Sequence, residues 1–153
     1  MPSDPPAPTN PLYSWGYQSR RLVDLLSILE RYKIGGLIDV RRVPFSKYQP
    51  EFCKDELKEA ANGAGLWYVS APHCFGNQSR TLPWDRPPDW EWGCQRATVD
   101  LAAVPVLLLC LERDPSLCHR AEVARAIQAI CGCKIFHLGF KVPPPAPEQM
   151  GLF

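Results

Sequence analysis

The sequence predicts an α/β fold, with one domain built on a mostly parallel five-stranded sheet and helices on both faces, Rossmann-like in outline. Short apolar runs alternate five times with stretches of helical periodicity, the pattern of strand and helix repeats in such sheets. The run at 104–109 is continuously apolar, which is typical of a strand buried on both faces. A length of 153 residues fits one domain of ordinary size.

Apolar spacing and turn residues place the individual elements. Leu22, Leu25, Leu26 and Leu29 recur at helical spacing after Ser19, which is a suitable helix cap. Glycines and prolines mark most of the boundaries. A long segment at 71–88 shows no clear element and is expected to be a functional or partly disordered loop. The expected strands are 12–16, 37–40, 66–70, 104–109 and 134–140, and the expected helices are 20–33, 54–62, 90–102 and 120–130.

Proline-rich ends flank this domain. Residues 1–11 and 142–153 are rich in proline and read as extended tails, which leaves 12–141 as the folded part. No apolar stretch is long enough to span a membrane, and no signal peptide is recognisable, so we expect a cytoplasmic protein with no membrane partner. The seven cysteines then read as mostly reduced thiols.

Reactive side chains follow the strands at what should be one edge of the sheet. Cys118 lies where a helix begins, beside His119, and these surroundings favour a thiolate. Cys118 is therefore the candidate nucleophile, although a buried packing role fits equally well. The loop of cysteine phosphatases is excluded, because Ser116 and Ala124 stand where that loop needs arginine after Cys110 or Cys118.

Two carboxylates and a metal site are further possibilities. Glu112 and Asp39 are candidate general acids or bases with Cys118 and His119, unless they form ion pairs with neighbouring arginines. No cofactor is the first expectation. Zinc held by Cys110, Cys118 and His119, with His73 or Cys74, is the alternative, although the spacing matches no zinc finger.

Arginines give the firmer inference about binding. Net charge is only +1, yet 11 of the 17 basic residues are arginine, which favours bidentate contacts with phosphate. Several of them follow strand ends. The predicted anion or nucleic-acid site consists of Arg20, Arg41, Arg42 and Arg120, with Tyr17 and Ser19.

Four segments resemble, in order, the motifs of the bacterial family known as domain of unknown function 488. They are YSWGYQSR at 13–20, IDVRRVPFSKYQPEF at 38–52, LWYVSAPHCFGN at 66–77 and LLCLERDPSLCHR at 108–120. The first departs from the family, which usually reads Gly-His-Ser where this chain has Gly16-Tyr17-Gln18-Ser19. The resemblance implies an α/β fold and a shared pocket, but no reaction.

The last five residues resemble the bacterial sliding-clamp-binding peptide Gln-Leu-x-Leu-Phe. Gln149 would set the register by hydrogen bonds, while Met150, Leu152 and Phe153 would enter an apolar pocket. We therefore expect a bacterial DNA-metabolism protein, in repair, replication or base modification, that the sliding clamp recruits and that binds DNA or a nucleotide. The alternatives are a small-molecule or nucleotide enzyme using thiol or metal chemistry, and a non-catalytic DNA-binding adaptor.

Overall fold

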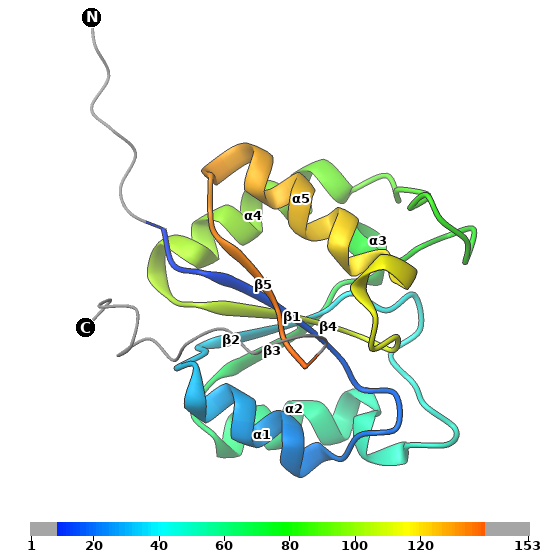
Figure 1. The fold of residues 1–153 in the computed structure, drawn as a ribbon, viewed down its shortest axis with the longest axis vertical. Coiled ribbons are helices and arrows are strands. Elements are labelled where there is room, and N and C mark those ends of the chain that lie inside the picture. The colour runs from blue at the N-terminus through cyan, green and yellow to red at the C-terminus, as the bar shows by residue number, and fades with distance from the viewer. Residues whose placement is uncertain (1–8, 140–153) are drawn as a thin grey trace, which may run out of the picture.

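Five parallel strands form the centre of the protein, as the sequence predicts, and helices cover both faces of the sheet (Figure 1). The computed structural model describes residues 9–139. Its elements are β1 (Leu12–Gly16), α1 (Leu22–Arg31), β2 (Gly36–Asp39), η1 (Pro50–Phe52), α2 (Lys54–Gly63), β3 (Trp67–Ser70), α3 (Pro72–Phe75), α4 (Trp90–Ala103), β4 (Val106–Cys110), η2 (Pro115–Leu117), α5 (Arg120–Cys131) and β5 (Ile135–His137).

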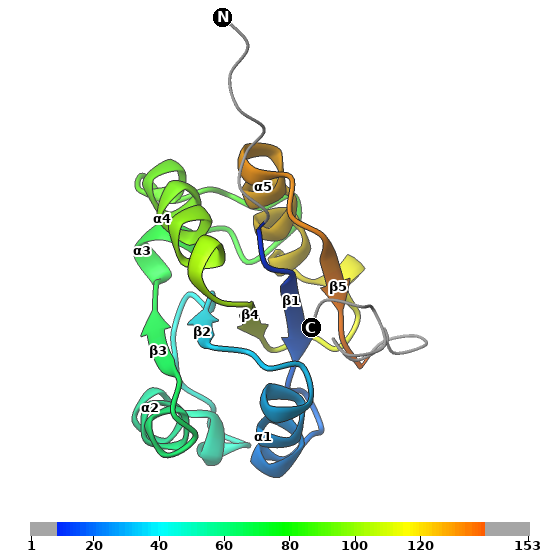
Figure 2. The same ribbon diagram turned by 90° about the vertical axis from the view of Figure 1, so that its left-hand side faces the viewer.

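The strand order β3-β2-β4-β1-β5 places a topological switch at the middle of the sheet. The chain leaves β1 and β2 for helices α1 and α2 on one face, and it leaves β4 for α5 on the other (Figure 2). The loops after β1 and β4 therefore separate at the carboxyl edge. Ligands of open α/β sheets bind at such a point, so the topology alone selects the edge formed by β1, β2 and β4.

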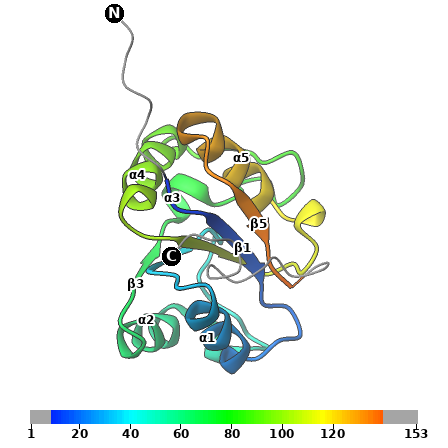
Figure 3. The same ribbon diagram turned by 60° about the vertical axis from the view of Figure 1, so that its left-hand side comes forward.

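Helices lie on both faces of the sheet (Figure 3), and an apolar layer on each face packs them against it. Alternate residues of each strand point to opposite faces, so Leu108 packs in the layer beneath α4 and α5 while Leu107 and Leu109 pack with α1 and α2. All five residues of β4 are buried. The continuous apolar run of the sequence is thus explained by a central strand with a helix layer on each side.

Some boundaries differ from those expected. The first helix begins at Leu22 rather than at residue 20, and Ser19 does not cap it, because its backbone has a φ of 60°. The backbone N–H of Arg21 is instead bonded to the Asp24 carboxylate at 2.8 Å. The segment 71–88 contains α3, which the sequence reading missed because a four-residue helix carries too little periodicity to detect.

The long segment at 71–88 is held by its own polar side chains. The Asn77 amide donates to the Thr81 carbonyl at 2.9 Å and accepts from the Asp85 N–H at 2.9 Å. Trp84 is buried, and Arg86 lies 5.2 Å from its ring and 4.0 Å from that of Trp90. Trp84 is therefore part of the apolar core.

Within residues 9–139, no helix has the length and apolar character that a membrane crossing requires.

Gly16 sets how closely the loop after β4 approaches β1. A Cβ atom at this position would collide with the backbone carbonyl of Glu112, whereas one at Gly63 would meet nothing within 4 Å. We expect Gly16→Ala to lower the free energy of unfolding by about 1–3 kcal/mol, since backbone must move to make room. Gly63→Ala is the matched control and should change it by under about 1 kcal/mol. Urea denaturation measures both, and equal midpoints would contradict the close approach.

Candidate functional site

The three central strands bring their carboxyl ends together around a cavity of about 300 Å³. Tyr17 follows β1, and Arg41 and Arg42 follow β2. Cys110 is the last residue of β4, and Glu112 lies just after it. All five residues line the cavity. Cys118 and His119, from the turn before α5, complete its floor. The cavity therefore contains most of the predicted site.

Two sulfur atoms and an imidazole converge at the floor of this cavity. The Sγ atoms of Cys110 and Cys118 and a ring nitrogen of His119 all lie within 4.8 Å of one another. The distance from Cys110 Sγ to His119 Nδ1 is 4.0 Å. All three residues are buried, with only 2% of Cys118 exposed. Seven residues lie between the two cysteines in the sequence, and the turn at η2 brings Cys118 back to the end of β4.

The pKa values of the two thiols are shifted in opposite directions. The Cys110 thiol donates to Cys118 and, with His119 and Arg120, lowers the pKa of Cys118 to about 3 in spite of burial. The backbone N–H of Arg120 also donates to the Cys118 sulfur at 3.5 Å. The hydrogen bond between Cys110 and Cys118, together with burial, raises the pKa of Cys110 well above its usual range. These opposite shifts favour a thiolate on Cys118 and a thiol on Cys110.

Hydrogen bonding fixes the orientation of the His119 ring. Its Nε2 atom is 2.8 Å from the carbonyl of Val40, so Nε2 carries the proton and Nδ1 faces the two sulfurs. Burial by itself would lower the pKa of His119, but the Cys118 thiolate raises it overall. Glu112 lies beside them, with Oε2 3.8 Å from Cys110 Sγ, and burial raises the pKa of its carboxyl group.

Arg120 lies beneath the cavity rather than in its wall. Its side chain is fully buried, at 0% exposure, and its guanidinium donates to Ser14 Oγ at 3.0 Å, to the Glu112 carbonyl and to the Arg113 carbonyl at 3.1 Å. Every nitrogen is thus engaged by protein oxygen. Sequence reasoning grouped Arg120 with the anion-binding residues, whereas here it braces the loop that carries Glu112.

Asp39 is engaged in a buried ion pair. Arg41 donates to its two carboxylate oxygens at 2.8 and 2.6 Å, and the Tyr68 hydroxyl donates to Oδ2 at 2.6 Å. Arg41 also donates to the Tyr17 hydroxyl at 3.2 Å. Burial raises the pKa of Tyr68, and the adjacent Asp39 raises it further. Of the two roles open to Asp39 from the sequence, the structure contains the ion pair with an arginine.

The other predicted anion-binding residues lie on both sides of Tyr17. Arg42 lines the cavity, while Ser19 and Arg20 line a neighbouring cavity next to α1. The Arg20 guanidinium donates to the Gly139 carbonyl at 2.5 Å and stands 5.3 Å from the Trp15 ring centre. Arg41 and Arg42 thus line one cavity, Arg20 lines the other, and Arg120 is buried. The peptide of Gln149, Met150, Leu152 and Phe153 lies outside the described residues.

Further residues that sequence reasoning did not select also line the cavity, among them Arg80, Asn77 and Phe45. Arg80 and Asn77 come from the segment at 71–88, and Phe45 comes from the loop after β2. Arg80 is exposed, with a left-handed φ of 63°. The signal for them was indirect, since both loops follow strands whose carboxyl ends meet at this edge.

The fold and this cavity define a Rossmann-like α/β protein with a thiol and imidazole centre at the switch point of its sheet. A family model described as domain of unknown function DUF488 matches residues 21–98, half of the chain, and the protein belongs to that family. The matched span includes Asp39, Arg41 and Arg42 but ends before Cys110 and Cys118. Comparisons with curated proteins and with solved structures find no match.

Thiol titration tests the charge state of this centre. In metal-free protein we expect one thiolate to persist into acid, because the pKa of Cys118 is lowered to about 3, far below the reference of about 8.5. Cys110→Ala should raise the Cys118 pKa by removing its main hydrogen-bond donor. Ultraviolet thiolate absorbance against pH measures both, with Cys53→Ser as the control elsewhere in the fold. Absence of any thiolate at neutral pH would refute the assignment.

Proposed function

We propose that the protein is a zinc-dependent hydrolytic enzyme of nucleic-acid or nucleotide metabolism, in which Cys110, Cys118 and His119 hold the metal. The observation that carries the proposal is the convergence of these three side chains at the floor of an open cavity. Three protein ligands with a fourth position open to water are the usual arrangement of a catalytic zinc site.

The distances are close to those that zinc requires. At tetrahedral angles, bonds of about 2.3 Å to sulfur and about 2.0 Å to nitrogen place two sulfurs and one nitrogen about 3.5–3.8 Å apart. The Cys110 Sγ to His119 Nδ1 distance of 4.0 Å and the 4.8 Å limit on all three separations differ from this by an ångström or less. Rotations about the side-chain bonds of the two cysteines would supply such a shift.

Charge and tautomer favour a metal as well. His119 donates its Nε2 proton to the Val40 carbonyl, a second interaction that metal-bound histidines commonly make, and its Nδ1 faces the sulfurs, where it would bind a metal once deprotonated. Two adjacent thiolates repel one another unless a dication lies between them. Two thiolates and Zn²⁺ together are neutral, so the arginines nearby are not an obstacle.

Glu112 and the surrounding cations suit hydrolysis of a phosphate-bearing substrate. A zinc ion held there would supply the nucleophile by lowering the pKa of a bound water. Glu112 lies next to the ligands without an ion pair among residues 9–139, and it would take the water proton and return it to the leaving group. Arg42 and Arg80 on the cavity wall would hold phosphate.

A second candidate function is nucleophilic catalysis by Cys118 without metal. It is favoured by one observation, the lowered pKa of this thiol at the start of α5, where the Arg120 N–H donates to sulfur. The 2% exposure of Cys118 counts against it, because a nucleophile must reach its substrate. Metal content distinguishes the two functions.

Metal analysis of the purified protein is the decisive measurement. We expect about one zinc per chain, reduced at least tenfold by Cys118→Ser or His119→Ala, because three protein ligands are needed to hold it. Cys53→Ser, a cysteine outside the cavity, is the matched control and should keep the metal. Replacement by Co²⁺ adds a spectrum diagnostic of tetrahedral thiolate ligands. Purified protein that contains no zinc and takes up no Co²⁺ would overturn the zinc site and favour the Cys118 nucleophile.

Recruitment to DNA is a separate part of the proposal and depends on the C-terminal sequence. Gln149, Met150, Leu152 and Phe153 fit the bacterial sliding-clamp-binding peptide, apart from methionine in place of its first leucine. The proline-rich stretch before them would hold the peptide away from the domain. A net charge of only +1 gives the chain little general attraction to DNA. Binding to the clamp would compensate for this by keeping the enzyme at a high local concentration near DNA.

A pull-down with purified sliding clamp tests recruitment. We expect the intact chain to be retained and a chain truncated after Ala146 to be lost. Leu152→Ala with Phe153→Ala should lose at least tenfold in affinity, because each buries a large apolar side chain worth about 1.5–3 kcal/mol. Cys118→Ser should bind the clamp normally, which separates recruitment from chemistry. Equal retention of intact and truncated protein would eliminate the clamp as partner.

A further inference from the structure

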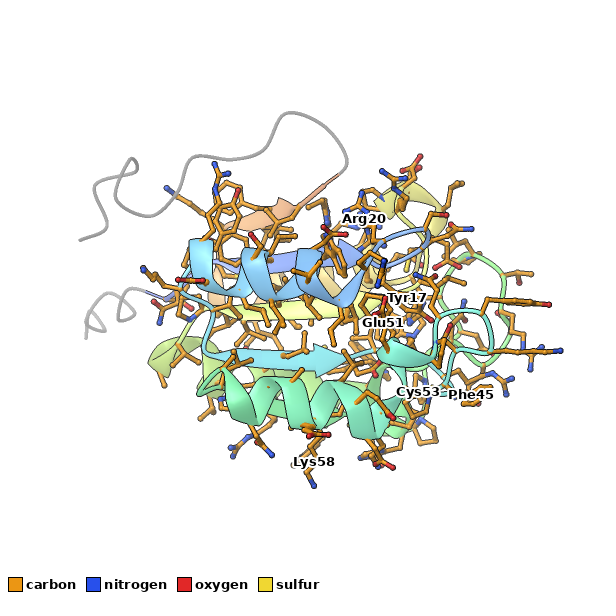
Figure 4. All side chains as sticks on the ribbon, turned by 90° about the horizontal axis from the view of Figure 1, so that it is seen from below. Tyr17, Arg20, Phe45, Glu51, Cys53 and Lys58 are labelled. Atoms are coloured by element: carbon orange, nitrogen blue, oxygen red, sulfur yellow. The ribbon has the colours of Figure 1, made fainter. Side chains whose placement is uncertain are left out.

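A second, larger cavity of about 870 Å³ adjoins the pocket that contains the Cys118 centre. The two share Tyr17, Phe45 and Leu111 as lining residues. The larger one lies between the start of α1 and the loop at 43–51, where Figure 4 shows Tyr17, Phe45 and Glu51 near the same end of the sheet. Together we call them the edge groove.

Two aromatic rings stand exposed on the loop that borders the edge groove. Phe45 is 63% exposed and Tyr48 is 88% exposed. The loop itself is anchored, because the Gln49 side chain donates to the carbonyl of Tyr17 at 3.0 Å and to that of Arg20 at 2.8 Å. An anchored loop that turns two rings outward keeps apolar surface in water, which is a common mark of a binding surface.

Cationic side chains line the same groove. Arg20, Arg21 and Lys47 border its larger part, and Arg42 and Arg80 border the part nearer Cys118. Only Arg21 has a carboxylate partner among residues 9–139, Glu51 at 3.3 Å. The whole chain carries a net charge of +1, so this concentration of unpaired cations is local.

We infer that the edge groove binds a single strand of nucleic acid, with bases stacked on Phe45 and Tyr48 and phosphates held by the cations, and that it leads the strand to the Cys118 centre. Aromatic rings interleaved with cations are the usual means of holding single strands. A duplex fits poorly, since its bases expose only their edges and the loop has no helix or strand to enter a groove. What the centre does to the strand rests on the proposed function.

The test is fluorescence anisotropy with the full chain and a labelled oligothymidine of about 12 nucleotides, within the site sizes known for such grooves. We expect binding that weakens with salt, and weaker binding of a duplex of equal length. Phe45→Ala and Tyr48→Ala should each weaken it about fivefold or more. Trp92→Ala is the matched control, because Trp92 is 60% exposed but lies on α4, outside the groove, and should bind normally.

Unchanged affinity in the Phe45→Ala, Tyr48→Ala double variant, or a duplex bound as tightly as the single strand, overturns the inference. Lys47→Gln should weaken binding and reduce its salt dependence. An oligouridine of the same length tells whether DNA or RNA is preferred, and tighter binding of either supports the groove. The Phe45→Ala, Tyr48→Ala double variant should keep its zinc, because neither residue belongs to the candidate metal ligands, so a failed groove and a failed zinc centre give different results.

Discussion

A fully buried arginine determines the geometry of the candidate site. Arg120 begins α5 and reaches under the cavity to Ser14 of β1 and to the carbonyls of Glu112 and Arg113. One guanidinium therefore joins a helix, a central strand and the loop after β4. Its five donors suit this task, which a lysine could not perform. Because Cys118 and His119 immediately precede it, their positions depend on the same contacts.

Arg120 also sets the charge balance of the cavity. Burying a cation is costly unless an anion compensates it, and no carboxylate pairs with Arg120 among residues 9–139. The neighbouring Asp39–Arg41 pair is already neutral. The attraction of Arg120 is one of the causes that lower the pKa of Cys118, and it acts before any ligand binds.

The sequence predicted the strands and the edge of the site because both depend on local pattern and handedness. The apolar run of β4 and the turn at Asp114 were enough to place Cys110 and Glu112 at a carboxyl end. The burial of Arg120 was not predictable, because it results from contacts with Ser14, more than a hundred residues away. Likewise, the exposure of Phe45 and Tyr48 depends on how Gln49 anchors their loop.

Two different surfaces meet at this edge of the sheet, the buried floor around Cys118 and the open groove beside it. The proposed reaction would take place at the first, and the proposed binding of the substrate chain at the second. The floor around Cys118 is buried, and its cavity of about 300 Å³ is at the small end of the range for ligand pockets. The groove beside it is open and lined by rings and cations, which would bind a chain polymer without reading its sequence. Selectivity for the reacting group would then arise at the floor, where Glu112, His119 and Arg42 surround it. A long substrate is compatible with a small reaction cavity only in such an arrangement, since the remaining length needs a surface of its own.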